Sequence, residues 1–123
     1  MPSYIVCRQM KILLDIDDTA LITKDNGRTW FEHPRLHELI SKHDVYLYSG
    51  NPDIESFFNR WRTKGFIPKA INYRPRADVL IDNNCDLHRS DVDVKKCYKS
   101  IDSFFKYNEK ARKKTRKRRS GRK

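Results

Sequence analysis

Three aspartates and a threonine stand together near the start of the chain, in the stretch KILLDIDDTALI at residues 11–22. Asp15 and Asp17 directly follow an apolar run that is typical of a buried strand. Because unpaired charge is costly at the end of such a strand, these carboxylates need a compensating partner. A divalent cation together with a phosphoryl group would provide one, so this stretch indicates phosphate chemistry.

Further polar residues are expected where later strands end. Ser49 closes the run VYLYS, and Asp82 closes the run VLID. The carboxyl ends of parallel strands share one edge of a sheet, and ligands bind at that edge. The carboxylates of Asp15, Asp17 and Asp82 would repel one another there. Magnesium relieves such repulsion, since it binds few carboxylates and completes its shell with water and substrate phosphate.

The elements that must position these residues alternate along the chain. The hydrophobic pattern predicts strands at 11–15, 45–51, 69–73 and 77–84, and helices at 33–42, 52–65 and 93–107. This alternation favours an α/β fold, specifically a Rossmann-like three-layer sandwich with a mainly parallel sheet. The residues of the last helix that are expected to face the sheet are Cys97, Ile101, Phe104 and Phe105.

Three motifs occur in the order that one enzyme superfamily uses. DIDDT at 15–19, YSGN at 48–51 and RPRADVLIDNNCD at 74–86 together resemble the haloacid dehalogenase superfamily of aspartate-nucleophile phosphatases. The resemblance covers about residues 10–90. It implies a haloacid-dehalogenase-like fold and a magnesium-dependent phosphomonoester hydrolase.

The resemblance assigns a role to each matching residue. Asp15 would attack phosphorus and form an aspartyl-phosphate, and Asp17 would act as general acid and then general base. The groups expected to hold magnesium are Asp15, Asp17 through its backbone carbonyl, Asp82 and Asp86. The residues expected at the phosphoryl group are Thr19, Ser49, Gly50 and Arg74.

Two positions depart from the pattern of that superfamily. Arg74 stands where most members have lysine, which keeps the positive charge but changes its geometry. Lys64 and Lys69 are weaker candidates for this basic role, because neither has the Pro-x-Ala-Asp context. Asn83 stands where many members have a second acid, so Asp86 is expected to supply the missing carboxylate.

The connections between the motifs are short. About 25 residues separate the first motif from the second predicted strand, and the next interval holds one helix and little else. A cap domain fits in neither interval. By resemblance, capless members tend to act on large substrates such as nucleic acid or protein, or to use oligomer contacts as a lid. An open site suits a phosphorylated polymer end.

The net charge is concentrated at the end of the chain. The formal net charge is +11, and residues 110–123 hold ten Lys or Arg and no acid. Residues 1–109 are nearly neutral, with 17 basic and 16 acidic side chains. The sequence therefore predicts a phosphatase domain at 1–109 and a disordered basic tail at 110–123. The tail is expected to attract DNA or RNA, with nuclear targeting or solubilisation as alternatives.

Cysteine usage and hydropathy bear on the cellular compartment. Cys7, Cys85 and Cys97 are odd in number and form no Cys-x-x-Cys pair, which argues against a secreted disulfide framework. Cys85 and His88 form only half of a zinc motif, so zinc is not expected. No secretory leader or membrane span is predicted. An intracellular protein, cytoplasmic or nuclear and without a membrane partner, is expected; its oligomeric state is left open.

Two aromatic residues and two histidines have alternative interpretations. Trp30 and Phe31 follow the first motif in a polar segment. They are expected to pack against the body, and stacking on a substrate base is the alternative. His33 and His37 have the i, i+4 spacing of a metal pair without a further ligand pattern, so both are expected at the surface.

These features predict a magnesium-dependent phosphatase that works through an aspartyl-phosphate. The favoured substrate is a phosphorylated nucleic acid end or a nucleotide. A phosphoprotein phosphatase is the nearest enzymatic alternative. A catalytically weak nucleic-acid-binding module with the same fold is the alternative from another class.

Overall fold

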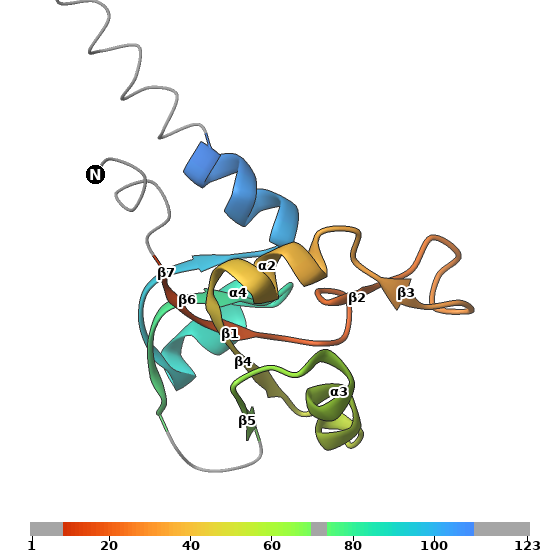
Figure 1. The fold of residues 1–123 in the computed structure, drawn as a ribbon, viewed down its shortest axis with the longest axis horizontal. Helices are drawn as coiled ribbons and strands as arrows, with labels where there is room; N and C mark the ends of the chain where they lie inside the picture. Colours follow the sequence, from red (N-terminus) through yellow and green to blue (C-terminus); the bar gives the residue numbers. More distant parts are fainter. Residues whose placement is uncertain (1–8, 70–73, 110–123) are drawn as a thin grey trace, which may run out of the picture.

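A five-stranded sheet forms the centre of the computed structural model, which describes residues 9–69 and 74–109 (Figure 1). Its strands lie in the order β5-β4-β1-β6-β7, and every neighbouring pair is parallel. The strands are β1 (Lys11–Leu14), β4 (Asp44–Ser49), β5 (Gly65–Pro68), β6 (Arg76–Ile81) and β7 (Asp93–Tyr98). The predicted α/β fold with a parallel sheet is thereby confirmed, and it is compatible with a Rossmann-like arrangement.

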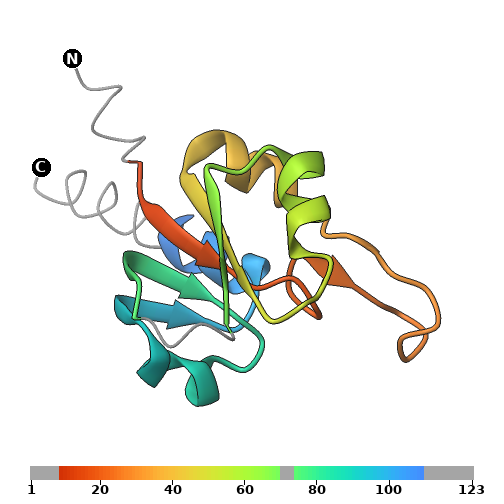
Figure 2. The same ribbon diagram turned by 90° about the horizontal axis from the view of Figure 1, so that it is seen from below.

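Helices flank this sheet (Figures 1 and 2). They are α2 (Leu36–Lys42), α3 (Ile54–Trp61), α4 (Cys85–His88), the short 3-10 helix η1 (Arg89–Asp91) and a helix at 101–109. Within the ranges described, no helix is long and apolar enough to cross a lipid bilayer.

Alternation along β1 divides the core between the two faces of the sheet. Ile12 and Leu14 point to one face and Leu13 to the other, and all three are fully buried. On the first face, α2 contributes Leu36 and Leu39, and the helix at 101–109 contributes Ile101, Phe104 and Phe105. The burial predicted for those last three residues is confirmed.

A small antiparallel hairpin leaves the body between β1 and α2. It consists of β2 (Leu21–Ile22) and β3 (Phe31–Glu32), and it projects outward in orange in Figure 1. Two hydrogen bonds hold its base. The backbone N–H of His33 donates to the carbonyl of Ala20 at 2.8 Å, and Trp61 Nε1 donates to Glu32 at 2.7 Å.

Strand β5, the third strand of the sheet in chain order, begins earlier than the hydrophobic pattern predicts. Helix α3 ends at Trp61, where Arg62 adopts a left-handed backbone (φ 52°) and turns the chain. The chain then pairs with β4 over Gly65–Pro68. The strand predicted at 69–73 is wrong at its first residue, which follows β5, and the rest of it lies outside the described residues.

The last predicted helix is also wrong in its first half. The segment Asp93–Tyr98 is strand β7, because five of its residues pair with residues of β6. The helix begins only at 101, where Ser100 Oγ accepts a hydrogen bond from the backbone N–H of Ser103. Cys97 therefore lies in a strand and not on a helix.

Two cysteines that lie far apart in the sequence are joined. Cys85 in α4 and Cys97 in β7 form a disulfide, with their Cα atoms 6.0 Å apart. The sequence did not predict this bond, because the odd number of cysteines was interpreted as evidence against a disulfide framework. Cys7 lies outside the described residues.

Candidate active site

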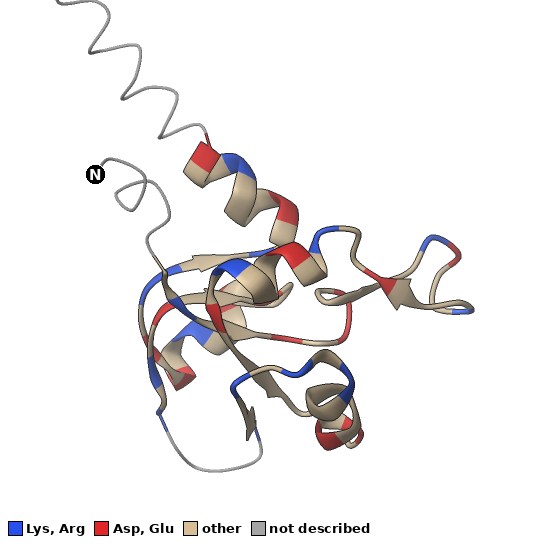
Figure 3. Cartoon of the chain, viewed as in Figure 1, with Lys and Arg blue, Asp and Glu red and all other residues tan. Residues whose placement is uncertain are grey.

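Four neighbouring strands deliver polar residues to one edge of the sheet. Asp15 follows β1, Ser49 ends β4, Lys69 follows β5 and Asp82 follows β6. Their strands end level with one another, because Leu14 pairs with Leu47 on one side and with Ile81 on the other. In Figure 3 the segment that follows β1 carries a run of acidic residues. The predicted convergence of carboxylates at the carboxyl edge is therefore present for Asp15 and Asp82.

Lys69 lies at the centre of this group. Its Nζ donates to Asp15 Oδ1 at 3.1 Å and to Asp82 Oδ2 at 2.8 Å, and it lies 3.0 Å from His88 Nδ1. An ammonium group has three donors, and the carboxylates of Asp15 and Asp82 accept two of them. The Lys69 side chain is 16% exposed, and those of Asp15 and Asp82 are 8% and 0% exposed. This arrangement is a buried ion triad and not a surface salt bridge.

The two carboxylates of the triad differ in proton affinity. Burial, and next the negative charge of Asp82, raise the pKa of Asp15 to about 6, although Lys69 opposes the shift. Burial also acts on Asp82, but hydrogen bonds from Lys69, the backbone N–H of Asn84 and His88 outweigh it and hold its pKa below the usual range. Asp82 is the permanent anion of the pair, and Asp15 is the carboxylate that most needs further positive charge.

The amide of Asn83 faces two oxygens of the first motif. One terminal atom of this amide lies 3.1 Å from Asp15 Oδ2 and 3.3 Å from the backbone carbonyl oxygen of Asp17. If that atom is the nitrogen, it donates to both oxygens. If it is the oxygen, three oxygens converge there, and a cation among them would be needed to offset their repulsion.

Thr19 connects the first and last motifs. Its hydroxyl donates to Asp15 Oδ2 at 3.3 Å and accepts from the backbone N–H of Asn83 at 3.1 Å. The side chain is almost fully buried, with 1% exposure. Thr19 therefore orients the Asp15 carboxylate and is not an open contact for a phosphoryl group.

Asp17 and Ser49 are linked through Asn51. Asn51 Nδ2 donates to Asp17 Oδ1 at 3.0 Å, and the backbone N–H of Asn51 donates to Ser49 Oγ at 3.1 Å. Asp17 is exposed, Ser49 is buried, and Gly50 between Ser49 and Asn51 is exposed. The open carboxylate of Asp17 is thus held beside the end of β4.

Two predicted residues are not brought to this group. Arg74 is exposed and precedes the start of β6, whereas Asp82 follows the end of that strand, so the two lie toward opposite edges of the sheet. The side chain of Asp86 is 91% exposed and lies 3.6 Å from Lys99. Lys69 occupies the place expected for Arg74, and Asn83 is nearer to the site than Asp86.

His88 was not predicted as a site residue. Its Nδ1 lies 2.8 Å from Asp82 Oδ2, and its side chain is 22% exposed. The short helix α4 turns the chain back over the end of β6, which brings residue 88 onto residue 82. No pattern in the sequence pointed to this contact.

The expectations for the other histidines and aromatic residues are partly corrected. His33 is buried, with 5% exposure, and its Nε2 lies 3.0 Å from Asp102 Oδ2. His37 is exposed as predicted, at 68% of its side chain. Trp30 and Phe31 are 40% and 37% exposed, so the body does not bury them.

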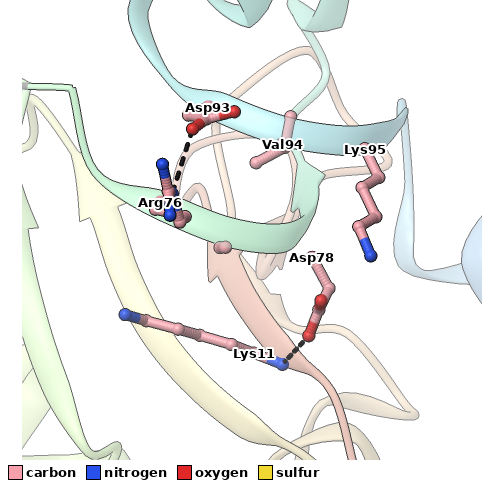
Figure 4. Close-up of a pocket in the computed structure, with 7 residues that line it drawn as sticks. Lys11, Arg76, Asp78, Asp93, Val94 and Lys95 are labelled. Atoms are coloured by element: carbon pink, nitrogen blue, oxygen red, sulfur yellow. Dashed lines mark hydrogen bonds and ion pairs between the residues drawn. The ribbon is translucent and has the colours of Figure 1, made fainter.

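A separate open pocket lies at the other edge of the sheet (Figure 4). Lys11, Arg76 and Asp93 line it, and these residues begin β1, β6 and β7. Arg76 pairs with Asp93 at 3.1 Å across its rim. Because it holds none of the site residues described above, this pocket is not the place for the predicted chemistry.

Side-chain ligands alone do not form a metal site here. Within residues 9–69 and 74–109, no group of three or more His, Cys, Asp or Glu side chains is arranged so that it could hold a metal ion. A cation beside Asp15 would therefore need the backbone carbonyl of Asp17 and the amide oxygen of Asn83.

The chain matches no family model, no curated protein and no solved structure.

Proposed function

We propose that this chain is a magnesium-dependent phosphomonoester hydrolase that works through an aspartyl-phosphate on Asp15. The observation that carries the proposal is the Asp15–Lys69–Asp82 triad at the carboxyl ends of parallel strands. Such a triad keeps one carboxylate next to a fixed cation, at the edge where α/β proteins bind ligands. The sequence resemblance to capless haloacid-dehalogenase-like phosphatases supports the same assignment.

The proposed reaction has two displacement steps at phosphorus. An oxygen of Asp15 forms a bond to phosphorus while the bond to the ester oxygen breaks, and Asp17 protonates the leaving oxygen. Water then attacks the same phosphorus, Asp17 accepts its proton, and the bond to Asp15 breaks to release phosphate. Asp17 suits both proton transfers because it is exposed and held by Asn51 at 3.0 Å.

Lys69 supplies the fixed positive charge of this site. It neutralises Asp15 before the attack and stabilises the charge that develops on the phosphoryl oxygens. Asp82 holds the ammonium in position at 2.8 Å. The Ser49 hydroxyl and the backbone beyond it are the proposed contacts for the phosphoryl group, because they end the neighbouring strand.

The residues beside Asp15 fit a magnesium ion. The Asn83 amide lies 3.1 Å from Asp15 Oδ2 and 3.3 Å from the carbonyl oxygen of Asp17, and with its oxygen turned toward them it would complete a set of three oxygen ligands. Magnesium accepts few protein ligands and keeps several waters, so a set of three oxygens is sufficient. When bound, it would neutralise charge on the carboxylate and on the phosphoryl group. Asn83 replaces Asp86 in the proposed ligand set, and Asp82 serves Lys69.

The favoured substrate is a phosphorylated nucleic acid end or a nucleotide. Within the described residues, the intervals from Asp15 to Ser49 and from Ser49 to Lys69 hold only the hairpin with α2 and then α3 with β5, which supports a site without a cap. An open site admits a polymer end. Ten basic residues at 110–123, which lie outside the described residues, would add attraction for a polyanion. A phosphoprotein phosphatase is the alternative enzyme, and a catalytically weak nucleic-acid-binding module is the alternative without catalysis.

A panel of phosphate esters tests this function. Purified protein is assayed with magnesium or chelator on an aryl phosphate, nucleotides, oligonucleotides phosphorylated at the 3′ or 5′ end, and phosphopeptides. We expect magnesium-dependent phosphate release, fastest from the oligonucleotides, and none from a folded Asp15→Asn variant. Equal release in chelator and in magnesium, or normal release by Asp15→Asn, contradicts the proposal.

A further inference from the structure

The tip of the hairpin is held in one shape by its own hydrogen bonds. Thr23 Oγ1 accepts from the backbone N–H of Gly27 at 2.9 Å, and Asp25 Oδ1 accepts from that of Thr29 at 2.8 Å. Trp30 Nε1 donates to the carbonyl of Gly27 at 3.1 Å. Gly27 has a φ of 89°, a conformation that an L side chain rarely adopts. A surface loop with this many internal contacts is preorganised.

This ordered tip presents aromatic rings to solvent. Trp30 and Phe31 are adjacent, and each is more than a third exposed. A single exposed aromatic residue is common on protein surfaces, but two together on a preorganised loop need a reason. The sequence places them on the element that directly follows the catalytic loop.

The charges on the tip are mainly positive. Lys24 and Arg28 are exposed and form no ion pair with another residue in the described ranges, and Lys24 Nζ lies 5.6 Å from the centre of the Phe31 ring. The one acid, Asp25, has its charge engaged by its own loop, since hydrogen bonds from Thr29 and Thr23 lower its pKa. In Figure 3 the outer end of the hairpin carries the colour of Lys and Arg, with one acidic segment between.

The base of the hairpin is tied to the proposed catalytic loop. Leu21 forms a backbone bridge with Asp17, and the N–H of Leu21 donates to the carbonyl of Ile16 at 2.9 Å. The aromatic pair is therefore carried at a set position relative to Asp15.

We propose that the hairpin at 21–32 is a stacking platform for a single-stranded nucleic acid, in which Trp30 and Phe31 receive a base while Lys24 and Arg28 contact the phosphate backbone. The inference rests on the proposed function in one respect, since the stacked base belongs to the strand whose phosphorylated end lies at Asp15. Exposed rings with interspersed cations match a ligand that alternates flat bases with negative phosphates. An apolar peptide would use the rings but gain nothing from the two cations.

Fluorescence and salt dependence test the platform directly. The chain has two tryptophans, and Trp61 is buried at 3% exposure. Quenching of tryptophan fluorescence by a stacked base therefore reports on Trp30. The full chain with Asp15→Asn, which prevents turnover, is titrated with a short single-stranded oligonucleotide with or without a terminal phosphate. A phosphopeptide of matched charge is titrated in parallel. The same variant with Trp30→Ala, Trp30→Phe, Lys24→Ala, Arg28→Ala or Leu87→Ala added is then titrated by anisotropy of a labelled oligonucleotide.

Each of these substitutions has its own expected signature. Trp30→Ala should weaken oligonucleotide binding about five-fold to a hundred-fold without changing the slope of log affinity against log salt. Trp30→Phe should keep most of the affinity. Lys24→Ala and Arg28→Ala should each reduce that slope by about 0.7. Leu87→Ala removes an apolar side chain that is 69% exposed on α4 and should bind as the parent does.

Three results would overturn the platform: no quenching by either oligonucleotide, equal binding by Trp30→Ala and Trp30→Phe, or quenching by the phosphopeptide as strong as by the oligonucleotides. The third result would assign the surface to a protein partner. Stacking does not require hydrolysis, so the two proposals fail separately. Loss of hydrolysis with quenching intact removes only the phosphatase, and hydrolysis without quenching removes only the platform.

Discussion

Lys69 and Asp82 form an ion pair of 2.8 Å in which the carboxylate is fully buried. The same ammonium lies 3.1 Å from Asp15. Lys69 follows β5, and its side chain therefore links the residues that follow β1 and β6. Removing one member of such a group leaves a buried charge without a partner, which is strongly destabilising. Structure and proposed chemistry therefore depend on the same side chain.

Lys69→Gln should damage both stability and turnover. It leaves Asp15 and Asp82 facing each other without a cation, and we expect a loss of about 3 to 5 kcal/mol in the free energy of unfolding without magnesium. Turnover should fall by about 100-fold or more, as expected when a preorganised electrostatic contact is removed. Denaturant titration and steady-state rates measure the two effects.

Arg74→Gln is the matched control for that substitution. Arg74 is exposed and precedes β6, so its loss should change stability by less than about 0.5 kcal/mol and leave turnover of a small phosphate ester nearly intact. If Arg74→Gln lost more stability and turnover than Lys69→Gln, Arg74 and not Lys69 would be the basic residue of the site.

Magnesium binding should depend on Asn83 and not on Asp86. Asn83→Ala removes the amide that faces Asp15 Oδ2 at 3.1 Å, and it should reduce the rise in melting temperature that magnesium produces. Asp86→Asn changes a side chain that is 91% exposed and should leave that rise unchanged. Thermal unfolding at a series of magnesium concentrations separates the two, and a loss of the response in Asp86→Asn alone would contradict the ligand set.

The free energy of unfolding of the metal-free protein should fall as pH rises through the range in which Asp15 ionises. Its pKa is raised from 3.8 to about 6, so the folded state holds this proton more tightly than the unfolded state. That contribution is complete below about pH 4 and is lost by about pH 6, with a total of about 3 kcal/mol. The comparison is between wild type and Asp15→Asn, measured by denaturant titration in chelator. Between those pH values, the free energy of unfolding of the variant should rise relative to that of the wild type by up to this amount. Parallel pH profiles would show that Asp15 does not titrate in this range.

Asp17→Asn should affect poor leaving groups more than good ones. If Asp17 protonates the leaving oxygen, alkyl phosphates should lose about 100-fold to 10,000-fold in rate, and phosphates of acidic phenols should lose less. A plot of log rate against leaving-group pKa should therefore be steeper for the variant. An unchanged slope would remove Asp17 from the role of general acid.

The sequence predicted the class of fold and the convergence of Asp15 and Asp82 at one edge of the sheet. Apolar runs of four to six residues separated by amphipathic segments are a strong signal, and β1, β4 and β6 lie close to their expected positions. Asp15, Ser49 and Asp82 follow directly from that pattern, because each stands at the end of one of these strands. Local periodicity is sufficient wherever a strand is fully buried.

Lys69 shows why the rest of the site was harder to predict. A strand at 69–73 would have put Lys69 at the amino edge of the sheet, away from the carboxylates. The observed strand ends at Pro68, so the same residue emerges at the carboxyl edge. The short run GFIP is too weak a pattern to fix a strand boundary, and a shift of four residues moved the basic residue of the site to the other edge.

Asn83 and His88 depend on tertiary contacts that no local pattern records. Asn83 was read as a missing acid, although its backbone N–H is tied to Thr19 at 3.1 Å and its amide to the first motif. His88 reaches Asp82 only because α4 is four residues long. Burial of Trp30 and Phe31 was predicted from their apolar character, but the hairpin that carries them projects from the body.

Trapping the covalent intermediate tests the central claim most directly. The full chain is mixed with magnesium and a phosphorylated substrate, quenched in acid during turnover, digested and weighed by mass spectrometry. We predict one phosphoryl group on the peptide that contains Asp15, seen only with magnesium and absent from Asp15→Asn. Borohydride reduction should convert the modified residue to homoserine, which marks the phosphorylated carboxylate. Steady hydrolysis without label on Asp15, or label on Ser49 or Thr19 in its place, would contradict the account.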